Sequence, residues 1–187
     1  MANMTTTMTK RRLSIKAQTL AALAAVAGAV ALPQLIHIAG AALGLGIIPG
    51  EVLLPMHLPI ILVGLLAGPF AGAAAGIAAP IVSFMLTGMP MAGMVPFMVL
   101  ELCAYGLFAG LLMNVKMNSI LKVFAVQIAG RVFYSLAIVA VVYGLGISTL
   151  VAPAAAWTGL ARGIVGIIIQ LIAIPAIVYG VDKLSRK

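Results

Sequence analysis

The sequence has very few charged residues, and acidic residues are the scarcest. Only 7% of its 187 residues are charged, and Asp and Glu together number three, against 11 Lys and Arg. Soluble domains usually carry about 25% charged residues, whereas 64% of this chain is hydrophobic. So little polar surface excludes a soluble enzyme and a disordered chain. Cys103 is the one cysteine, which excludes an internal disulfide and with it a secreted disulfide scaffold.

Sequence motifs that carry chemistry are also absent. There is no G-x-x-x-x-G-K-[ST] loop for ATP, and no H-E-x-x-H motif or Cys/His cluster for a metal ion. The basic residues lie at the ends of apolar runs and form no stripe of the kind that binds nucleic acid. We therefore predict that the chain uses no cofactor or metal, binds no nucleic acid and hydrolyses no ATP itself.

Long apolar runs, interrupted by Gly, Pro and a few charges, make up most of the chain. A transmembrane helix needs about 20 apolar residues, and the uncharged run 17–50 is too long for the apolar core of a signal peptide. The runs predict one six-helix membrane domain over residues 1–187, with a basic N-terminus at 1–16, a loop at 44–55 and a tail at 182–187. The predicted helices cover about 17–43, 56–67, 70–86, 96–113, 120–145 and 157–181.

The basic residues predict which side of the membrane each end faces. Cytoplasmic segments are enriched in Lys and Arg, and with six helices nine of the 11 basic residues fall in the two tails and the loop between helices 4 and 5. The other side receives only Glu51. The fold class is therefore an all-α integral membrane protein with six transmembrane helices and both termini in the cytoplasm. The nine residues are Lys10, Arg11, Arg12, Lys16, Lys116, Lys122, Lys183, Arg186 and Lys187.

Three charged residues remain inside predicted helices: Glu101, Arg131 and Arg162. Placing a charge within a span costs about 2.5–3.5 kcal/mol on insertion scales, so such groups usually face an interior or a cavity. Because two arginines face one carboxylate, we expect a surplus of positive charge that favours an anionic or zwitterionic ligand. The alternative is a structural Glu101–Arg131 ion pair, with Arg162 reaching out to the interface.

Polar residues at helical spacing accompany these charges. Gln127, Arg131 and Tyr134 share a face at i, i+4 and i+7, as do Arg162 and Gln170. His57 opens the second predicted helix, where it is either a ligand group or a satisfied polar helix end, and we expect His37 to be structural. The predicted substrate-binding residues are His57, Glu101, Gln127, Arg131, Tyr134, Arg162 and Gln170.

Small residues recur every fourth position on two parts of the chain, which lets helix backbones approach closely in lipid. One ridge lies on the first helix and serves either a partner subunit or internal packing; we expect the other to serve internal packing. The first consists of Ala17, Ala21, Ala25 and Ala29, the second of Gly64, Gly68, Gly72 and Gly76.

Short sequence segments together with this layout resemble a known family. The segments are PMHLP at 55–59, GLLAGP at 64–69, TGMP at 87–90 and ELCAYG at 101–106. With the six helices, the cytoplasmic termini and the alanine ridge, they make residues 10–187 similar to the substrate-binding S component of energy-coupling factor (ECF) transporters.

The resemblance implies a division of labour between subunits of an importer in the cell membrane. The S component binds a vitamin from outside, and a transmembrane T subunit with two cytoplasmic ATPases supplies the energy. Its alanine motif contacts the T subunit, which maps here to Ala21 and Ala25, extending to Ala17 and Ala29. The substrate stays open among pantothenate, pyridoxine-type compounds, cobalamin precursors and queuosine-type bases. Two alternatives are an intramembrane enzyme using Glu101 and His57 as acid and base, and a structural membrane subunit without a ligand.

Overall fold

The computed structural model describes residues 13–144 and 155–184, and every regular element in this part of the chain is helical. Six segments are long and apolar enough to cross a membrane: 15–42, 48–67, 69–87, 92–112, 119–139 and 161–184. The predicted all-α class with six spans is therefore confirmed. The elements are α1 (Ile15–Ala42), α2 (Ile48–Leu53), α3 (His57–Ala67), α4 (Pro69–Thr87), η1 (Ala92–Met94), α5 (Val95–Leu112), α6 (Ser119–Val139), η2 (Ala140–Gly144) and α7 (Ala155–Leu184).

The helix ends follow from local sequence. The hydroxyl of Ser14 accepts a hydrogen bond from the Ala17 amide at 3.3 Å and caps α1, and the Asn118 side chain caps α6 in the same way at 2.9 Å. Gly68 separates α3 from α4 with φ of 104°, which a side chain would strain, and Pro69 then opens α4 without needing its missing N–H. The break predicted at this Gly-Pro pair is confirmed.

One element lies where the sequence predicts a loop. Residues 48–53 form the short helix α2, which has Pro49 in its first turn and Glu51 near its N-terminus, where the helix dipole favours a carboxylate. Leu54 ends it in the left-handed conformation, with φ of 48°. The predicted loop at 44–55 is therefore only partly correct, because six residues are too few for a helical period to stand out.

The other helix boundaries differ less from the prediction, but two charged residues lie in surroundings that the sequence did not predict. The predicted fifth helix ends as α6 at Val139 and continues as the π turn η2, while the predicted loop at 148–153 lies outside the described residues. Asp182, expected in the tail, belongs to α7 and is buried. Lys122, counted with the cytoplasmic loop at the start of the fifth predicted helix, is buried in α6, and its Nζ donates to the Met113 carbonyl at 3.1 Å.

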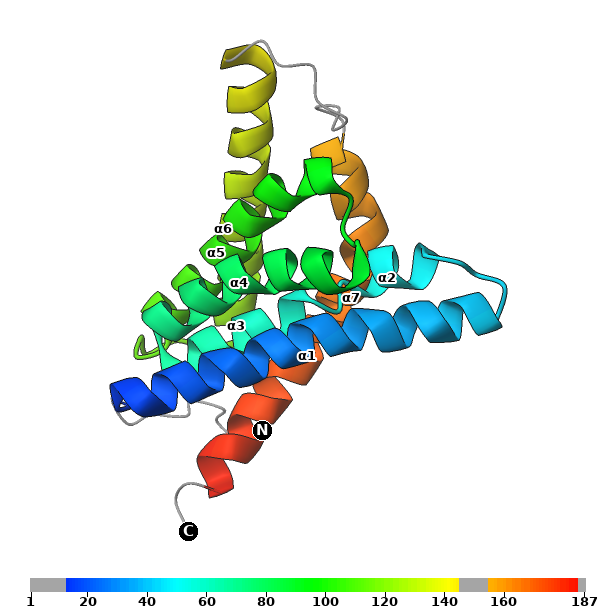
Figure 1. Ribbon diagram of the computed structural model, residues 1–187. Helices are drawn as coiled ribbons and strands as arrows, with labels where there is room; N and C mark the ends of the chain where they lie inside the picture. The colour runs from blue at the N-terminus through cyan, green and yellow to red at the C-terminus, as the bar shows by residue number, and fades with distance from the viewer. Residues whose placement is uncertain (1–12, 145–154, 185–187) are drawn as a thin grey trace.

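The helix α5 lies at the centre of the packing, against α3, α4 and α6. In Figure 1, α1 runs across the bundle while α6 and α7 stand steeply to it. The closest approach is between α4 and α5, where a Cβ on Gly72 would meet the backbone of Gly106 and a Cβ on Gly106 would meet that of Gly72. The glycine ridge predicted for internal packing therefore does serve it. The buried core includes Ile60, Ile61, Leu65, Leu102, Tyr105, Val123 and Val126.

The alanine ridge of α1 turns toward the protein interior. Ala29 is fully buried and Ala25 nearly so, both in the core, whereas Ala17 and Ala21 are half-buried. Of the two roles left open for the ridge, internal packing thus describes Ala25 and Ala29. In this arrangement of the chain other helices cover these two alanines, and a contact with a T subunit stays a prediction for them.

Candidate substrate-binding site

A cavity of about 430 Å³ lies where α1 and α4 end and α5 begins. This volume is in the range of small-molecule sites, about 300–1,000 Å³. Its walls come from the C-terminal half of α1, α2 and the junction to α3, the turn after α4, the start of α5, the middle of α6 and the start of α7. Of the predicted residues, the structure brings five to this cavity: His57, Glu101, Arg131, Tyr134 and Arg162.

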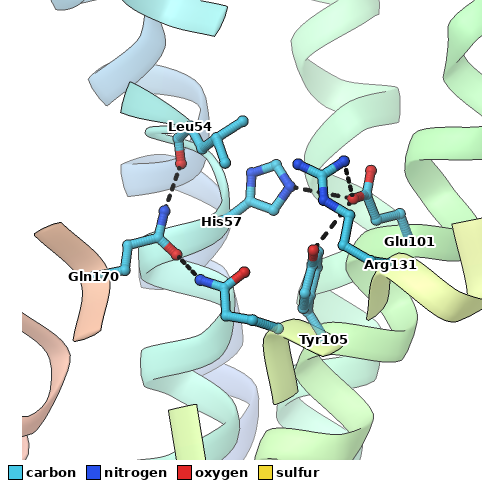
Figure 2. A network of polar contacts seen from close by, with 7 residues as sticks. Leu54, His57, Glu101, Tyr105, Arg131 and Gln170 are labelled. Carbon is cyan, nitrogen blue, oxygen red and sulfur yellow. Dashed lines mark hydrogen bonds and ion pairs between the residues drawn. The ribbon is translucent and has the colours of Figure 1, made fainter. Parts of the chain in front are cut away.

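Glu101 is the centre of a polar network on the cavity wall. Its side chain is 5% exposed, and its Oε1 lies 3.0 Å from Nη1 of Arg131. The hydroxyl of Tyr105 donates to the same oxygen at 3.3 Å. Nε2 of His57 is 3.7 Å away, too far for a direct hydrogen bond. Figure 2 shows these side chains converging from α3, α5 and α6. The Glu101–Arg131 ion pair that the sequence left as an alternative is therefore present.

Several buried polar atoms of the cavity lack a hydrogen-bond partner among the described residues. They are Nδ1 and Nε2 of His57, Nε2 of Gln34 and Nε of Arg131. The His57 ring instead packs edge-on against Tyr105, with centroids 5.0 Å apart. Because buried polar groups are nearly always hydrogen-bonded in native proteins, these atoms are suited to contact a ligand.

A second ion pair stands at the exposed rim of the cavity. Nη1 of Arg162 lies 2.7 Å from Oε2 of Glu51, with side chains 64% and 42% exposed, so the pair links α7 to α2. The described lining thus holds two arginines and two carboxylates. The expected surplus of positive charge is wrong, because Glu51, predicted to lie in a loop, joins the lining and pairs with Arg162.

Gln127 and Gln170 do not line the cavity but hold one of its wall residues in place. Both are buried, and Nε2 of Gln127 donates to Oε1 of Gln170 at 2.8 Å. Nε2 of Gln170 donates in turn to the Leu54 carbonyl at 3.1 Å (Figure 2). Since Leu54 lines the cavity, these glutamines position a wall residue, and their predicted role as direct ligand contacts needs this correction.

Other lining residues were missed or misjudged from the sequence. His37, expected to be structural, lines the cavity, as do Gln34 and Ser83. Five methionines also line it, and four of them belong to a methionine-rich stretch between residues 85 and 98 that the sequence analysis did not use. The five are Met56, Met89, Met91, Met94 and Met98.

No set of three His, Cys, Asp or Glu side chains within the described ranges is placed to hold a metal ion. The cavity's chemistry consists instead of an ion-paired carboxylate, unpartnered nitrogen atoms and thioethers. This arrangement suits reversible binding of a small molecule.

The family model described as "ECF transporter, substrate-specific component" matches residues 15–178. No curated protein and no solved structure matches the chain. The matched range runs from the first turn of α1 into the last third of α7 and contains all the described cavity residues.

Proposed function

The chain belongs to the family of ECF transporter substrate-specific components, and from this membership we propose that it captures a vitamin or related micronutrient from outside the cell. The protein is a multi-pass subunit of the cell membrane that binds substrate for an ECF importer. In the proposed function it passes the substrate on together with a T subunit and two cytoplasmic ATPases, which supply the energy.

The distribution of lysines supports a cavity that opens to the outside. Lys16 at the start of α1, Lys116 between α5 and α6, and Lys183 at the end of α7 are exposed. Each lies at the helix end remote from the cavity residues of the same helix, since the cavity uses the end of α1 and the starts of α5 and α7. Because Lys and Arg are retained on the cytoplasmic side, the cavity end faces outward.

The observation that carries the proposal is the set of buried polar atoms without a hydrogen-bond partner on side chains that line the cavity. His57 and Arg131 offer such atoms beside the Glu101 network, and Tyr134 and Arg162 complete the polar part of the lining. We assign substrate contact to these five residues. Gln127 and Gln170 hold the Leu54 wall, and the half-buried end of the alanine ridge, at Ala17 and Ala21, is the proposed contact with the T subunit.

Substitution of Arg131 tests this assignment. We expect Arg131→Ala to weaken binding of the substrate by at least tenfold, about 1.4 kcal/mol, because it removes a donor from the cavity wall and leaves Glu101 without its cation. Binding is measured by calorimetry on the purified chain, using the compound that stabilises the wild type most in a thermal-shift screen of micronutrients. Lys116→Ala removes the same charge from an exposed loop and serves as the control.

Two outcomes contradict the proposal. If a folded Arg131→Ala protein binds as tightly as the wild type, Arg131 has only a structural role. If the wild type binds no micronutrient at micromolar concentration and co-purifies with no T subunit or ATPase, the chain does not capture substrate for an importer.

A further inference from the structure

We infer that the substrate is a compound without net charge that carries a flat aromatic or heteroaromatic ring, and that it is not a simple carboxylate or phosphate. The inference rests on the proposed function, since it concerns the ligand of the same cavity. It follows from three independent features of the lining: the balance of its charges, the kind of unpartnered polar atoms, and the methionine side chains.

The charges of the cavity are already neutralised within the chain. Arg131 is paired with Glu101 at 3.0 Å and Arg162 with Glu51 at 2.7 Å. An anionic ligand that takes Arg131 as its counter-ion competes with Glu101, whose side chain is 5% exposed. Leaving a buried carboxylate without its cation is strongly unfavourable. A ligand without net charge can enter while both ion pairs stay intact.

The unpartnered atoms favour a ligand that has both hydrogen-bond acceptors and a hydrogen-bond donor. Nε2 of Gln34 and Nε of Arg131 can only donate, whereas a neutral His57 ring provides one donor and one acceptor. A fully ionised phosphate or carboxylate offers acceptors alone and leaves the acceptor nitrogen of His57 unmatched. A heteroaromatic edge with a ring nitrogen or carbonyl beside an N–H or O–H group matches both kinds.

The apolar part of the cavity is built largely from methionines. Met89, Met91, Met94 and Met98 come from one continuous stretch, the turn after α4 and the start of α5, and Met56 adds a fifth thioether at the start of α3. Thioether sulfur is polarisable and makes favourable contacts with aromatic rings. Flexible methionine side chains also adjust to a flat face, so this wall is suited to a ring.

Paired ligands that differ in one property test the inference on the purified full-length chain. Calorimetry compares riboflavin with its 5′-phosphate, pyridoxine with its 5′-phosphate, nicotinamide with nicotinate, and panthenol with pantothenate. We expect the tightest ligand to be one of the uncharged aromatic compounds, and its anionic counterpart to bind at least tenfold more weakly. If an anion or panthenol is the tightest ligand, the inferred ligand class is wrong although the capture of substrate stands.

The same experiments distinguish a failure of the proposed function from a failure of the inferred ligand class. If none of the eight compounds binds and the chain does not co-purify with a T subunit, the function itself is wrong. If the chain co-purifies with a T subunit but binds no aromatic compound of the set, the inferred ligand class is overturned.

A charge-removing variant provides a second readout. Glu101→Gln leaves Arg131 without its carboxylate, so we expect the preference for the uncharged member of a pair to fall at least tenfold. Lys116→Gln removes a charge from an exposed loop outside the cavity lining and should alter the preference less than threefold. An unchanged preference in a folded Glu101→Gln protein contradicts the inference. If that variant elutes as an aggregate, the ratio of the wild type's affinities for the uncharged and the anionic member of each pair decides.

Discussion

Gln170 shows how one residue can matter to the site without touching a ligand. Its side chain joins two segments, accepting from Gln127 on α6 and donating to the carbonyl of Leu54 between α2 and α3. Leu54 has φ of 48°, which is unusual for a residue with a branched side chain. The hydrogen bond to its carbonyl therefore helps to hold a cavity wall residue in a conformation that the local sequence does not favour.

We expect Gln170→Leu to lower the free energy of unfolding by about 1–2 kcal/mol, because the Leu54 carbonyl and the amide of Gln127 lose their partner. Unfolding in detergent by heat or denaturant measures the loss. A double-mutant cycle with Gln127→Leu should give a coupling of at least about 0.5 kcal/mol. Strict additivity of the two substitutions would contradict a direct role for the Gln127–Gln170 bond.

The sequence predicted individual site residues better than it predicted their partners. Glu101, Arg131 and Arg162 stood out because a charge inside an apolar run is unfavourable unless it is used. Their mutual pairing depends on which helices are neighbours, which spacing along one helix does not specify. Glu51 was placed in a loop, and its ion pair with Arg162 joins residues that lie far apart in the chain.

At the scale of elements, small residues determine how closely the helices meet. Between α4 and α5, Gly72 and Gly106 bring the two backbones into direct contact, and Gly110 approaches Pro69 in the same way. The spacing of Gly64, Gly68, Gly72 and Gly76 predicted close packing correctly. It did not predict α5 as the partner, because a row of small residues marks a surface without saying which helix covers it.

Alanine substitutions separate this packing role from helix propensity. We expect Gly72→Ala to lower the free energy of unfolding by about 1–3 kcal/mol or more, because the added Cβ meets rigid backbone atoms of Gly106. Gly180→Ala is the matched control in α7, where nothing lies within 4 Å of the added Cβ. That variant should be neutral or stabilise the helix by up to about 1 kcal/mol. Equal effects of the two substitutions on thermal unfolding in detergent would contradict the close-contact account.

Among the α-helices of the described residues, the short helix α2 was the one that the sequence did not predict. Two neighbours hold it in place more than its own propensity does: the ion pair of Glu51 with Arg162 and the packing of Leu54 against Gly163 of α7. A six-residue helix is marginal by itself, since helix formation is cooperative and short helices gain most of their stability from tertiary packing. Tertiary contacts of this kind leave no periodic signal in the sequence.

At the scale of the whole molecule, charge placement separates two ends with different tasks. Exposed lysines mark the end remote from the cavity, whereas the cavity end carries its charges as ion pairs. The positive charge of the chain therefore sets its orientation and contributes little to the chemistry of the site.

Cysteine labelling tests the orientation directly. In a Cys103→Ala background, we expect Ala92→Cys to react with a membrane-impermeant maleimide in intact cells, because η1 lies at the cavity end. Lys116→Cys should react only after the membrane is opened. Leu102→Cys, which is buried, should react in neither case and controls for non-specific labelling. Reaction of Lys116→Cys in intact cells would reverse the proposed orientation.

Assembly with a T subunit depends on which face of α1 remains available. Ala25 and Ala29 are covered by the chain's own core, whereas Ala17 and Ala21, nearer the start of α1, are half-buried and continue the same small-residue face. Close helix approach in lipid requires small side chains, so we expect Ala17→Leu combined with Ala21→Leu to reduce co-purification of the T subunit at least tenfold.

The control for this prediction is Ala27→Leu, on an exposed face of the same helix. It adds the same side chain without filling the ridge, and co-purification should stay within twofold of the wild type. Both variants should bind substrate normally, because all three alanines lie outside the cavity lining. If the double variant still assembles, the whole ridge serves internal packing as Ala25 and Ala29 do. If Ala27→Leu abolishes assembly instead, the T subunit binds the opposite face of α1.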